Sequence, residues 1–373
     1  MDELTPLLTE KAKVRIALVG LNFGGRWISA YQQHPNVATV GLCDTNEKIL
    51  HRVADSHGIE HRYTSLENIL ESDEYDAVHL FTPIPLHAEQ TIAVLSANKH
   101  CACAIPMAVR IEDVRRIVET QRRCNVNYML METEAYSPTL MLAKTLYDNG
   151  EFGELQFLRG VHYQNMEGWP GYWVGLAPMY YCYHGLGPVL HLTGKRATHV
   201  TCLGSGRLPD TMQQNYGNPF PVESALFQLE DSDVVCEVTS CLFQMVRPHL
   251  TDRFYIYGDR LGFESAQISG GKPVVFEAER GPLLPGQRGR EATTRYRAVP
   301  NLNGYVTDAF AEYIHQAQFN QGVLLVHEFI RSIVENRPPS IDVHTAANWT
   351  AAGTTAHQSA MQGGEKLVIP RFD

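Results

Sequence analysis

The sequence predicts an α/β protein of two domains: a parallel sheet covered by helices, followed by an α/β domain with a large, mostly antiparallel open sheet. Two observations lead to this class. Residues 14–130 alternate short apolar runs with amphipathic stretches, which is typical of βαβ units. After Tyr136 the runs mix β-branched and aromatic residues without long helices between them, which favours antiparallel strands. We therefore expect domains over residues 12–134 and 135–373.

In the first domain, each apolar run predicts a buried strand and each amphipathic stretch predicts a helix that crosses back over the sheet. Strands are expected over residues 14–19, 38–43, 77–81, 100–104 and 128–131. Helices are expected over residues 26–33, 46–57, 65–71, 87–97 and 111–124. Prolines that follow the third and fourth runs, Pro83 and Pro106, end those strands.

In the second domain, a helix over 138–149 ends at Gly150 and is followed by shorter, β-rich runs. Strands are expected over residues 155–162, 198–203, 222–229, 233–239 and 253–257. Helices are expected over residues 323–335 and 346–362, and after the aromatic segment 169–183. Residues 279–302 are rich in Gly, Pro and Arg and predict a long surface excursion, for which a functional lid and plain disorder both stay open.

Bulk composition excludes several classes of function. The formal net charge is −10 and no basic run exists, so we expect neither nucleic acid nor a membrane as partner. The acidic N-terminus has no apolar core of a signal peptide, and no apolar run is long enough to cross a bilayer. The 8 cysteines form no C-x-x-C pair, which indicates reduced thiols and no metal site. A cytoplasmic location is therefore expected.

The turn after the first strand, GLNFGG at residues 20–25, predicts a dinucleotide site. In a G-x-G-x-x-G fingerprint, glycines allow a tight turn, approach to the pyrophosphate and close helix packing. Gly20 and the Gly24–Gly25 pair fit, whereas Asn22 replaces the second glycine and Phe23 follows it. Asp44, at the end of the next strand, would bind the ribose hydroxyls and repel a 2′-phosphate, which favours NAD over NADP. An ordinary glycine turn with a solvated Asp44 is the alternative.

Several ordered motifs resemble the glucose–fructose oxidoreductase / inositol dehydrogenase (Gfo/Idh/MocA) family. They read FTPIPLHAEQ at 81–90, ANKH at 97–100, AIPMA at 104–108, GEFG at 150–153, HEFIRSI at 327–333 and SAMQGG at 359–364. The resemblance implies a Rossmann domain that binds NAD, a second domain with a large sheet, and homodimers or homotetramers formed through that sheet. It also implies that the cofactor is lined by Thr82, Pro83, His87, Ala104 and Ile105.

The family's dehydrogenases are similar to one another in a Lys–Asp–His set that removes the hydroxyl proton as hydride leaves. At the corresponding positions this sequence has Ile105, Tyr180 and His184, so only the His remains. An isoleucine can line the nicotinamide pocket but can neither donate nor accept a proton. The usual dehydrogenase relay is therefore absent.

The segment YCYHGLGP at 181–188 resembles the Y-P-T-H-G-L-G-P segment of the family's NAD-dependent α-N-acetylgalactosaminidases. The match implies that Tyr181 and His184 are catalytic and contact substrate, and that Thr133 stands where the branch has a cofactor-contacting Asn. Tyr183 replaces a Thr, and the preceding loop lacks the branch's Trp-Arg pair. We therefore do not transfer the N-acetylgalactosamine specificity. A cytoplasmic relative that cleaves an anionic sugar, such as a sulfoquinovoside, fits the missing signal peptide better, and this is the substrate that we expect.

The remaining candidates are aromatic or basic. Flat aromatic side chains often form sugar sites, and the candidates for substrate contact are Tyr163, Trp169, Tyr172, Trp173 and Tyr183. Core packing is the alternative for these aromatics. Arg247, His249 and the loop 288–290 could bind an acidic group or simply be solvated. His191 follows His184 by two helical turns, but a metal site would need a third ligand.

Three functions compete. The first is an NAD-dependent glycoside hydrolase that acts by transient oxidation at C3, elimination across C1–C2, water addition and re-reduction. The second is an NAD-dependent sugar or polyol dehydrogenase with an unusual relay. The third is an inert NAD(H)-binding sensor, which the loss of Lys and Asp would also permit.

Overall fold

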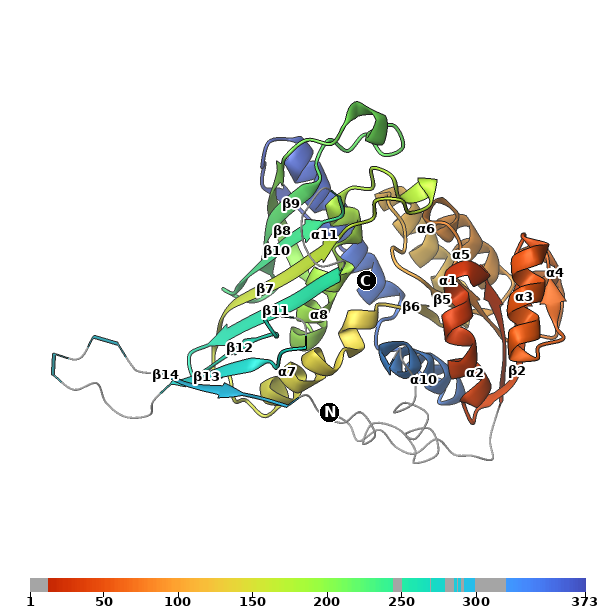
Figure 1. Ribbon diagram of the computed structural model, residues 1–373, viewed down its shortest axis with the longest axis horizontal. Helices are drawn as coiled ribbons and strands as arrows, with labels where there is room; N and C mark the ends of the chain where they lie inside the picture. Colours follow the sequence, from red (N-terminus) through yellow and green to blue (C-terminus); the bar gives the residue numbers. More distant parts are fainter. Residues whose placement is uncertain are drawn as a thin grey trace. The chain divides into compact units, whose positions relative to one another are not determined.

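Residues 13–243, 250–268, 270–278, 285–286, 288–289, 292–298 and 320–373 are described by the computed structural model (Figure 1). They fall into two compact units. The first, here called the Rossmann unit, holds residues 13–133, 320–351 and 372–373. The second, the sheet unit, holds the described residues among 134–298 and 352–371. Residues 320–351 thus pack with the Rossmann sheet, while the functional division at residue 134 stays a prediction.

The described part of the Rossmann unit contains a 6-stranded sheet in the order β3-β2-β1-β4-β5-β6, with every pair parallel. Its strands are β1 Val14–Val19, β2 Val37–Cys43, β3 Arg62–Tyr63, β4 Ala77–Leu80, β5 His100–Cys103 and β6 Tyr128–Leu130. This is the doubly wound order, whose ligand site lies beyond the carboxyl ends of the strands. β4 is buried along its whole length, as expected for a sheet covered on both faces. The predicted parallel sheet is confirmed.

Helices of the Rossmann unit follow the predicted ranges closely. They are α1 Leu21–Gly24, α2 Ile28–Gln33, α3 Glu47–His57, α4 Leu66–Glu71, α5 His87–Ser96, α6 Ile111–Arg122 and α10 Asn320–Val334. The helix expected from residue 26 begins instead at Leu21, because the glycine turn leads directly into α1, a short 3₁₀ segment and α2. α3 begins where the Asn46 side chain accepts hydrogen bonds from the amides of Lys48 and Ile49.

Within the described residues of the sheet unit, 9 strands form one sheet in the order β14-β13-β12-β11-β7-β10-β9-β8-β15. They are β7 Leu155–Gln164, β8 Ala197–Ser205, β9 Val222–Leu229, β10 Val235–Cys241, β11 Leu250–Gly258, β12 Leu261–Glu264, β13 Val274–Ala278, β14 Ala292–Tyr296 and β15 Leu367–Val368. Only the β10–β7 pair is parallel among these strands. The predicted, mostly antiparallel sheet is confirmed.

The prediction missed several strands at the sheet's edges. β12, β13 and β15 were not expected, and β14 falls inside the stretch 279–302, where we expected a surface excursion. The remainder of that stretch lies largely outside the described residues, as do Arg247, His249 and Arg290. β14 and β15 are the outer strands of the sheet, and such strands carry weak signals because one edge meets solvent, so their residues need not alternate between polar and apolar. β12 and β13 have neighbours on both sides but are only 4 and 5 residues long, too short for a clear alternation.

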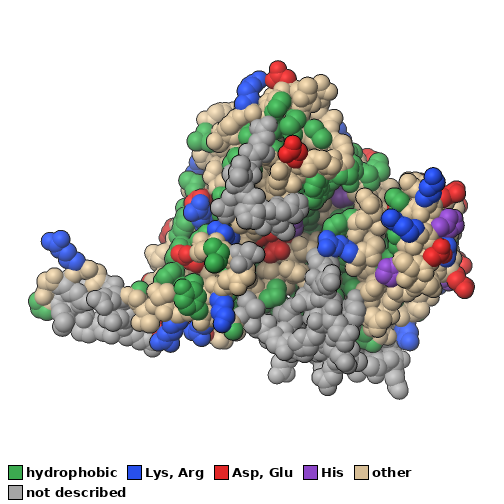
Figure 2. All heavy atoms as spheres, viewed as in Figure 1, with side chains coloured by type: hydrophobic (Ala, Val, Ile, Leu, Met, Phe, Trp, Pro, Cys, Tyr) green, Lys and Arg blue, Asp and Glu red, His purple; other side chains and the backbone are tan. Residues whose placement is uncertain are grey.

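Helices cover one face of this sheet. α7 Pro138–Asp148 and α8 Tyr183–Thr193 lie on it (Figure 1), and α11 Val343–Met361 begins in the Rossmann unit and ends in the sheet unit. α8 approaches β7 so closely that a methyl group at Gly160 would overlap the carbonyl oxygen of Gly185. No helix of the described chain is long and apolar enough to cross a membrane. On the face shown in Figure 2, Lys and Arg side chains are interspersed with Asp and Glu.

Candidate active site

The glycine turn after β1 has the geometry that a dinucleotide site needs. Gly20 has a φ of 90°, and a Cβ there would lie 2.8 Å from the carbonyl oxygen of Phe81. A Cβ at Gly24 would lie 2.6 Å from the Phe81 ring. Glycine is therefore required at both positions, the first for the turn and the second for the packing of α1 against the strand end. Asn22 and Phe23 lie exposed on the same turn, where a ligand can reach them.

The Asp44 carboxylate is fixed beside this turn. Its Oδ2 accepts a hydrogen bond from the amide of Leu21 and its Oδ1 accepts one from the amide of Asn46, both at 2.8 Å. Each carboxylate oxygen can accept a second bond, so the group can still receive the ribose hydroxyls. Its charge would repel a phosphate at the 2′ position.

The other predicted cofactor residues follow the ends of parallel strands. Thr82 and Pro83 come after β4, Ala104 and Ile105 after β5, and Thr133 after β6. Because the carboxyl ends of parallel strands meet at one edge, the fold brings these residues to the edge that also holds the glycine turn. Ile105 is buried, whereas the other four residues are half-buried.

His87 connects two of the turns at this edge. Its side chain is 1% exposed, and its two ring nitrogens lie 2.7 Å from the carbonyl oxygens of Pro106 and Thr82. A carbonyl only accepts, so both nitrogens must carry hydrogens, and the ring is an imidazolium. Burial lowers the pKa of His87, but Cys103 and the two carbonyls outweigh burial and raise it to about 9. The cation ties the turn after β4 to the turn after β5.

In the sheet unit, the two predicted catalytic side chains lie together. The rings of Tyr181 and His184 are 5.3 Å apart and nearly perpendicular. Tyr181 is buried and His184 is half-buried, so the histidine has the more open position. A third ring, which sequence reasoning missed, completes the cluster: His162 lies 4.9 Å from His184 and 5.6 Å from Tyr181.

His162 is paired with Asp252. Its Nδ1 lies 2.6 Å from Asp252 Oδ1, and residues 162 and 252 stand directly opposite each other on β7 and β11. Two further cross-strand pairs, His162 with Ser240 and Ser240 with Glu223, extend a polar row over β10 and β9. We call Asp252, His162, Ser240 and Glu223 the polar row. Alternation along β7 could have indicated His162, since Leu158, Gly160 and His162 share one face.

At the other end of the polar row, Glu223 holds the segment that carries Tyr181. The Glu223 side chain is fully buried; its Oε2 accepts from the amide of Met179 at 2.8 Å, and its Oε1 accepts from His357 Nδ1 at 2.6 Å. The Tyr180 ring packs against His357, with ring centroids 4.8 Å apart. Tyr180, which occupies the position of the family Asp, is thus directed to this pair, and burial raises its pKa.

Some of the aromatic residues that are predicted to contact substrate lie together in the structure. Trp173 contacts Trp169, Tyr172 and Tyr181 with centroid distances of 5.2, 5.8 and 5.1 Å. The half-buried rings of Trp169, Tyr172 and Trp173 are thereby connected, through Tyr181, to the ring cluster of His162 and His184. Tyr183 is buried, and strand alternation puts Tyr163 on the face of β7 opposite His162. Substrate contact by these residues stays a prediction.

Two other features lie away from this chemistry. His191 packs against Tyr136, and burial lowers its pKa to about 4. No metal-binding group of side chains is found in the described part of the chain.

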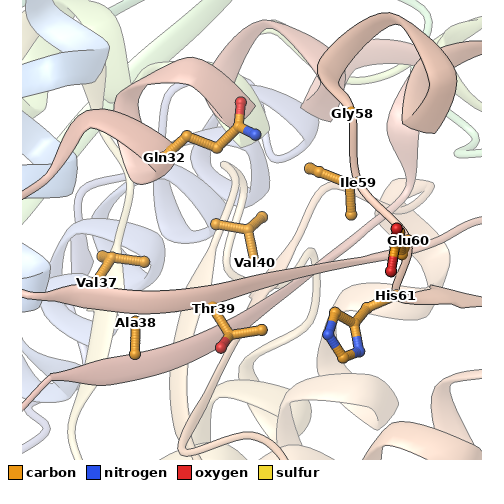
Figure 3. A pocket seen from close by; sticks show the side chains of 9 residues that line it. All are labelled: Gln32, Val37, Ala38, Thr39, Val40, Gly58, Ile59, Glu60 and His61. Carbon is orange, nitrogen blue, oxygen red and sulfur yellow. The ribbon is translucent and has the colours of Figure 1, made fainter.

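Figure 3 shows a pocket on the Rossmann unit lined by Gln32, residues 37–40 and residues 58–61. It adjoins the amino-terminal half of β2, the opposite end of the strand from Asp44, so it is not the cofactor site.

Comparison with known proteins identifies the first domain. Residues 14–131 match the model of the Gfo/Idh/MocA oxidoreductase family with an NAD-binding Rossmann fold. The N-terminal domain is a Gfo/Idh/MocA domain. Over these residues, the predicted family and its cofactor, NAD, are confirmed.

Curated relatives cover nearly the whole chain at low identity. A glycosyl hydrolase family 109 protein and an α-N-acetylgalactosaminidase, both of Bacteroides fragilis, are each 23% identical over 96% of this chain and 92% of their own length. Among solved structures, levoglucosan dehydrogenase in complex with NADH and levoglucosan has a TM-score of 0.78 at 18% identity, over 96% of this chain and 100% of the other. An Agrobacterium radiobacter oxidoreductase in complex with NAD+, L-tartaric acid and magnesium has a TM-score of 0.75 at 17% identity, over 96% and 99%.

The carboxylate of Asp44 predicts the cofactor preference of the Gfo/Idh/MocA domain. NAD+ should bind at least ~10-fold more tightly than NADP+, or about 1.4 kcal/mol, in titration calorimetry. Asp44→Ala should narrow this gap mainly by improving NADP+ binding. Glu47→Ala, which removes an exposed carboxylate three residues further on, should leave the preference intact. Equal affinities in the unmodified protein would contradict the assignment.

The imidazolium of His87 predicts a pH-dependent stability. Its pKa is raised from 6.5 to about 9 on folding, so its contribution is complete below pH 6.5 and is lost as the pH rises through about 9. His87→Gln should lower the free energy of unfolding at pH 6.5 by on the order of 2–3 kcal/mol, and the difference from wild type should shrink toward pH 9. Thermal unfolding between pH 6 and 10 measures this. His61→Gln, at an exposed histidine, should show no pH-dependent difference from wild type. If His87→Gln lowers the free energy of unfolding by the same amount at every pH, the buried cation is refuted.

Proposed function

We propose that this protein is an NAD-dependent glycoside hydrolase that oxidises a sugar transiently at C3, eliminates the aglycone across C1–C2, adds water and re-reduces the ketone. The observation that carries the proposal is the perpendicular Tyr181–His184 pair, 5.3 Å apart, in a chain with Ile105 and Tyr180 at the positions of the dehydrogenase Lys and Asp. The glycosidase names of the nearly full-length relatives support it.

Bound NAD would supply a reversible acceptor of hydride from a sugar carbon. The half-exposed His184 is suited to take the proton of the 3-hydroxyl, since imidazole titrates near neutrality. A ketone at C3 acidifies the hydrogen at C2, and Tyr181 is the group proposed to remove it. Elimination then expels the aglycone from C1 as an oxyanion. Water supplies the hydroxyl group at C1, and its remaining proton goes to the aglycone oxygen. Tyr181 returns its proton to C2, and His184 returns its proton to the oxygen at C3 as the ketone is re-reduced. No net oxidation results.

The substrate is proposed as a carbohydrate glycoside, with an anionic sugar such as a sulfoquinovoside as the specific candidate. The missing Trp-Arg pair of the α-N-acetylgalactosaminidase loop argues against N-acetylgalactosamine, and the anionic sugar itself stays a prediction. The aromatic rings of Trp169, Tyr172 and Trp173 would pack against the sugar faces. The cytoplasmic location stays a prediction.

A sugar or polyol dehydrogenase is the second candidate. It is favoured by His184, the one member of the dehydrogenase set that the sequence retains, and by the sugar dehydrogenase among the structural neighbours. Net NADH formation distinguishes the two functions, because the glycosidase returns its hydride to the sugar. An inert sensor would bind NAD and produce neither NADH nor free aglycone.

We also propose that the chain forms a homodimer or homotetramer through the open face of its sheet. Leu203, Leu226 and Val368 are 58%, 50% and 69% exposed on the neighbouring strands β8, β9 and β15. Sedimentation equilibrium should show a dimer or tetramer, and the double substitution Leu203→Glu with Leu226→Glu should produce monomers. A monomeric wild-type chain at micromolar concentration would refute this proposal.

The oxidation–elimination route makes a specific isotopic prediction. Because the C2 hydrogen is removed and later replaced, sugar released in D₂O should carry deuterium at C2 while NAD+ stays oxidised. Mass spectrometry of the product and absorbance of NADH measure both. Cleavage without any cofactor, or NADH accumulation without release of aglycone, would contradict the route. His184→Ala should lower turnover ~10²–10⁴-fold, whereas His199→Ala, on β8, should not.

A further inference from the structure

The pair formed by Asp252 and His162 is buried beneath the catalytic rings. The exposed fractions of the two side chains are 9% and 0%. Strand pairing fixes their relation, because the two residues are directly opposite in the β11–β7 ladder. The 2.6 Å contact joins Asp252 Oδ1 to His162 Nδ1.

This contact decides which ring nitrogen carries the proton. A carboxylate can only accept, so Nδ1 is the protonated nitrogen of a neutral His162 ring, and Nε2 keeps its lone pair. Nε2 is buried and has no hydrogen-bond partner among the residues that the structure describes. A buried polar atom left unsatisfied costs about 1–3 kcal/mol, so such an atom calls for a functional explanation.

The groups that face His162 come from every element packed on it. Tyr181 and His184 cover it from the helical side, Asp252 lies on β11, and Ser240 lies opposite it on β10. Glu223 and His357 follow beyond Ser240. The two members that lie in ring contact with His162 are also those that the proposed reaction uses as proton carriers.

We infer that His162, oriented by Asp252, is the proton-holding residue behind Tyr181 and His184, an inference that rests on the proposed function. When the sugar O–H bond breaks, its proton goes to the catalytic pair, and a proton of that pair passes to Nε2 of His162. The resulting imidazolium is stabilised by the Asp252 carboxylate, and the proton returns when the ketone is re-reduced. His162 is fully buried, so it is a positioning residue that acts through the two rings and does not touch the sugar.

This role explains how a phenol can act as a base. Tyrosine has a reference pKa near ~10, so at neutral pH its proton needs an acceptor close by. An imidazole whose orientation is fixed by a carboxylate is such an acceptor, as in the arrangement that activates nucleophiles in hydrolases.

Asp252→Asn tests the inference in the full-length protein. The asparagine amide can donate to Nδ1, which moves the ring hydrogen to Nε2 and removes the acceptor. We expect kcat to fall at least ~10²-fold, with KM changed less than ~3-fold and the acidic side of the kcat–pH profile displaced. Asp210→Asn, at an exposed carboxylate of the same unit, is the matched control and should behave as wild type.

A second measurement does not depend on glycoside cleavage. Nitrogen-15 NMR of labelled protein should show the Nδ1–H form of His162 in wild type and the Nε2–H form in Asp252→Asn, with His162→Gln used to assign the signal. An Nε2–H ring in wild type, or a folded Asp252→Asn variant with unchanged kcat and pH profile, overturns the inference. If the wild-type protein forms NADH without releasing aglycone, the proposed function fails. The inference about His162 is then tested by comparing the rates of NADH formation of the same variants.

Discussion

The backbone of a helix can touch the backbone of a strand only where no side chain lies between them, and here that contact is Gly160 against Gly185. A methyl group on Gly160 would overlap the Gly185 carbonyl oxygen, so the approach of α8 to β7 depends on glycine. His184 directly precedes Gly185. His162 follows Gly160 by two residues, so the two lie on the same face of β7. The contact therefore brings the centroids of the two histidine rings to 4.9 Å from each other, and the proposed catalytic cluster depends on it.

The polar row shows why this cluster is built on strands. Asp252, His162, Ser240 and Glu223 are held in register by four neighbouring strands, so their separations are set by the ladder. Buried carboxylate–histidine pairs add little net stability, because desolvation offsets their attraction. Their presence at both ends of the row is better explained by function: Asp252 orients His162, and Glu223 fixes the backbone that presents Tyr181.

The Rossmann unit holds two charged side chains in fixed positions for a related purpose. Asp44 is fixed by the amides of Leu21 and Asn46, and the His87 cation joins the turns that follow β4 and β5. Both groups are held by main-chain atoms. The edge of the sheet is therefore shaped before any cofactor arrives, which lowers the entropy lost on binding.

Local patterns in the sequence determined the order of the elements, the glycine turn, the acidic residue after the second strand and the loss of the dehydrogenase Lys and Asp. These features depend on periodicity and on residues close together in the chain, which a sequence displays directly. The pairs His162–Asp252 and Glu223–His357 join residues separated by 90 and 134 positions. Only the tertiary structure decided them, because they depend on which strands become neighbours and in what register. Tyr163, which the sequence suggested, and His162, which is buried against the rings of Tyr181 and His184, are adjacent residues of β7.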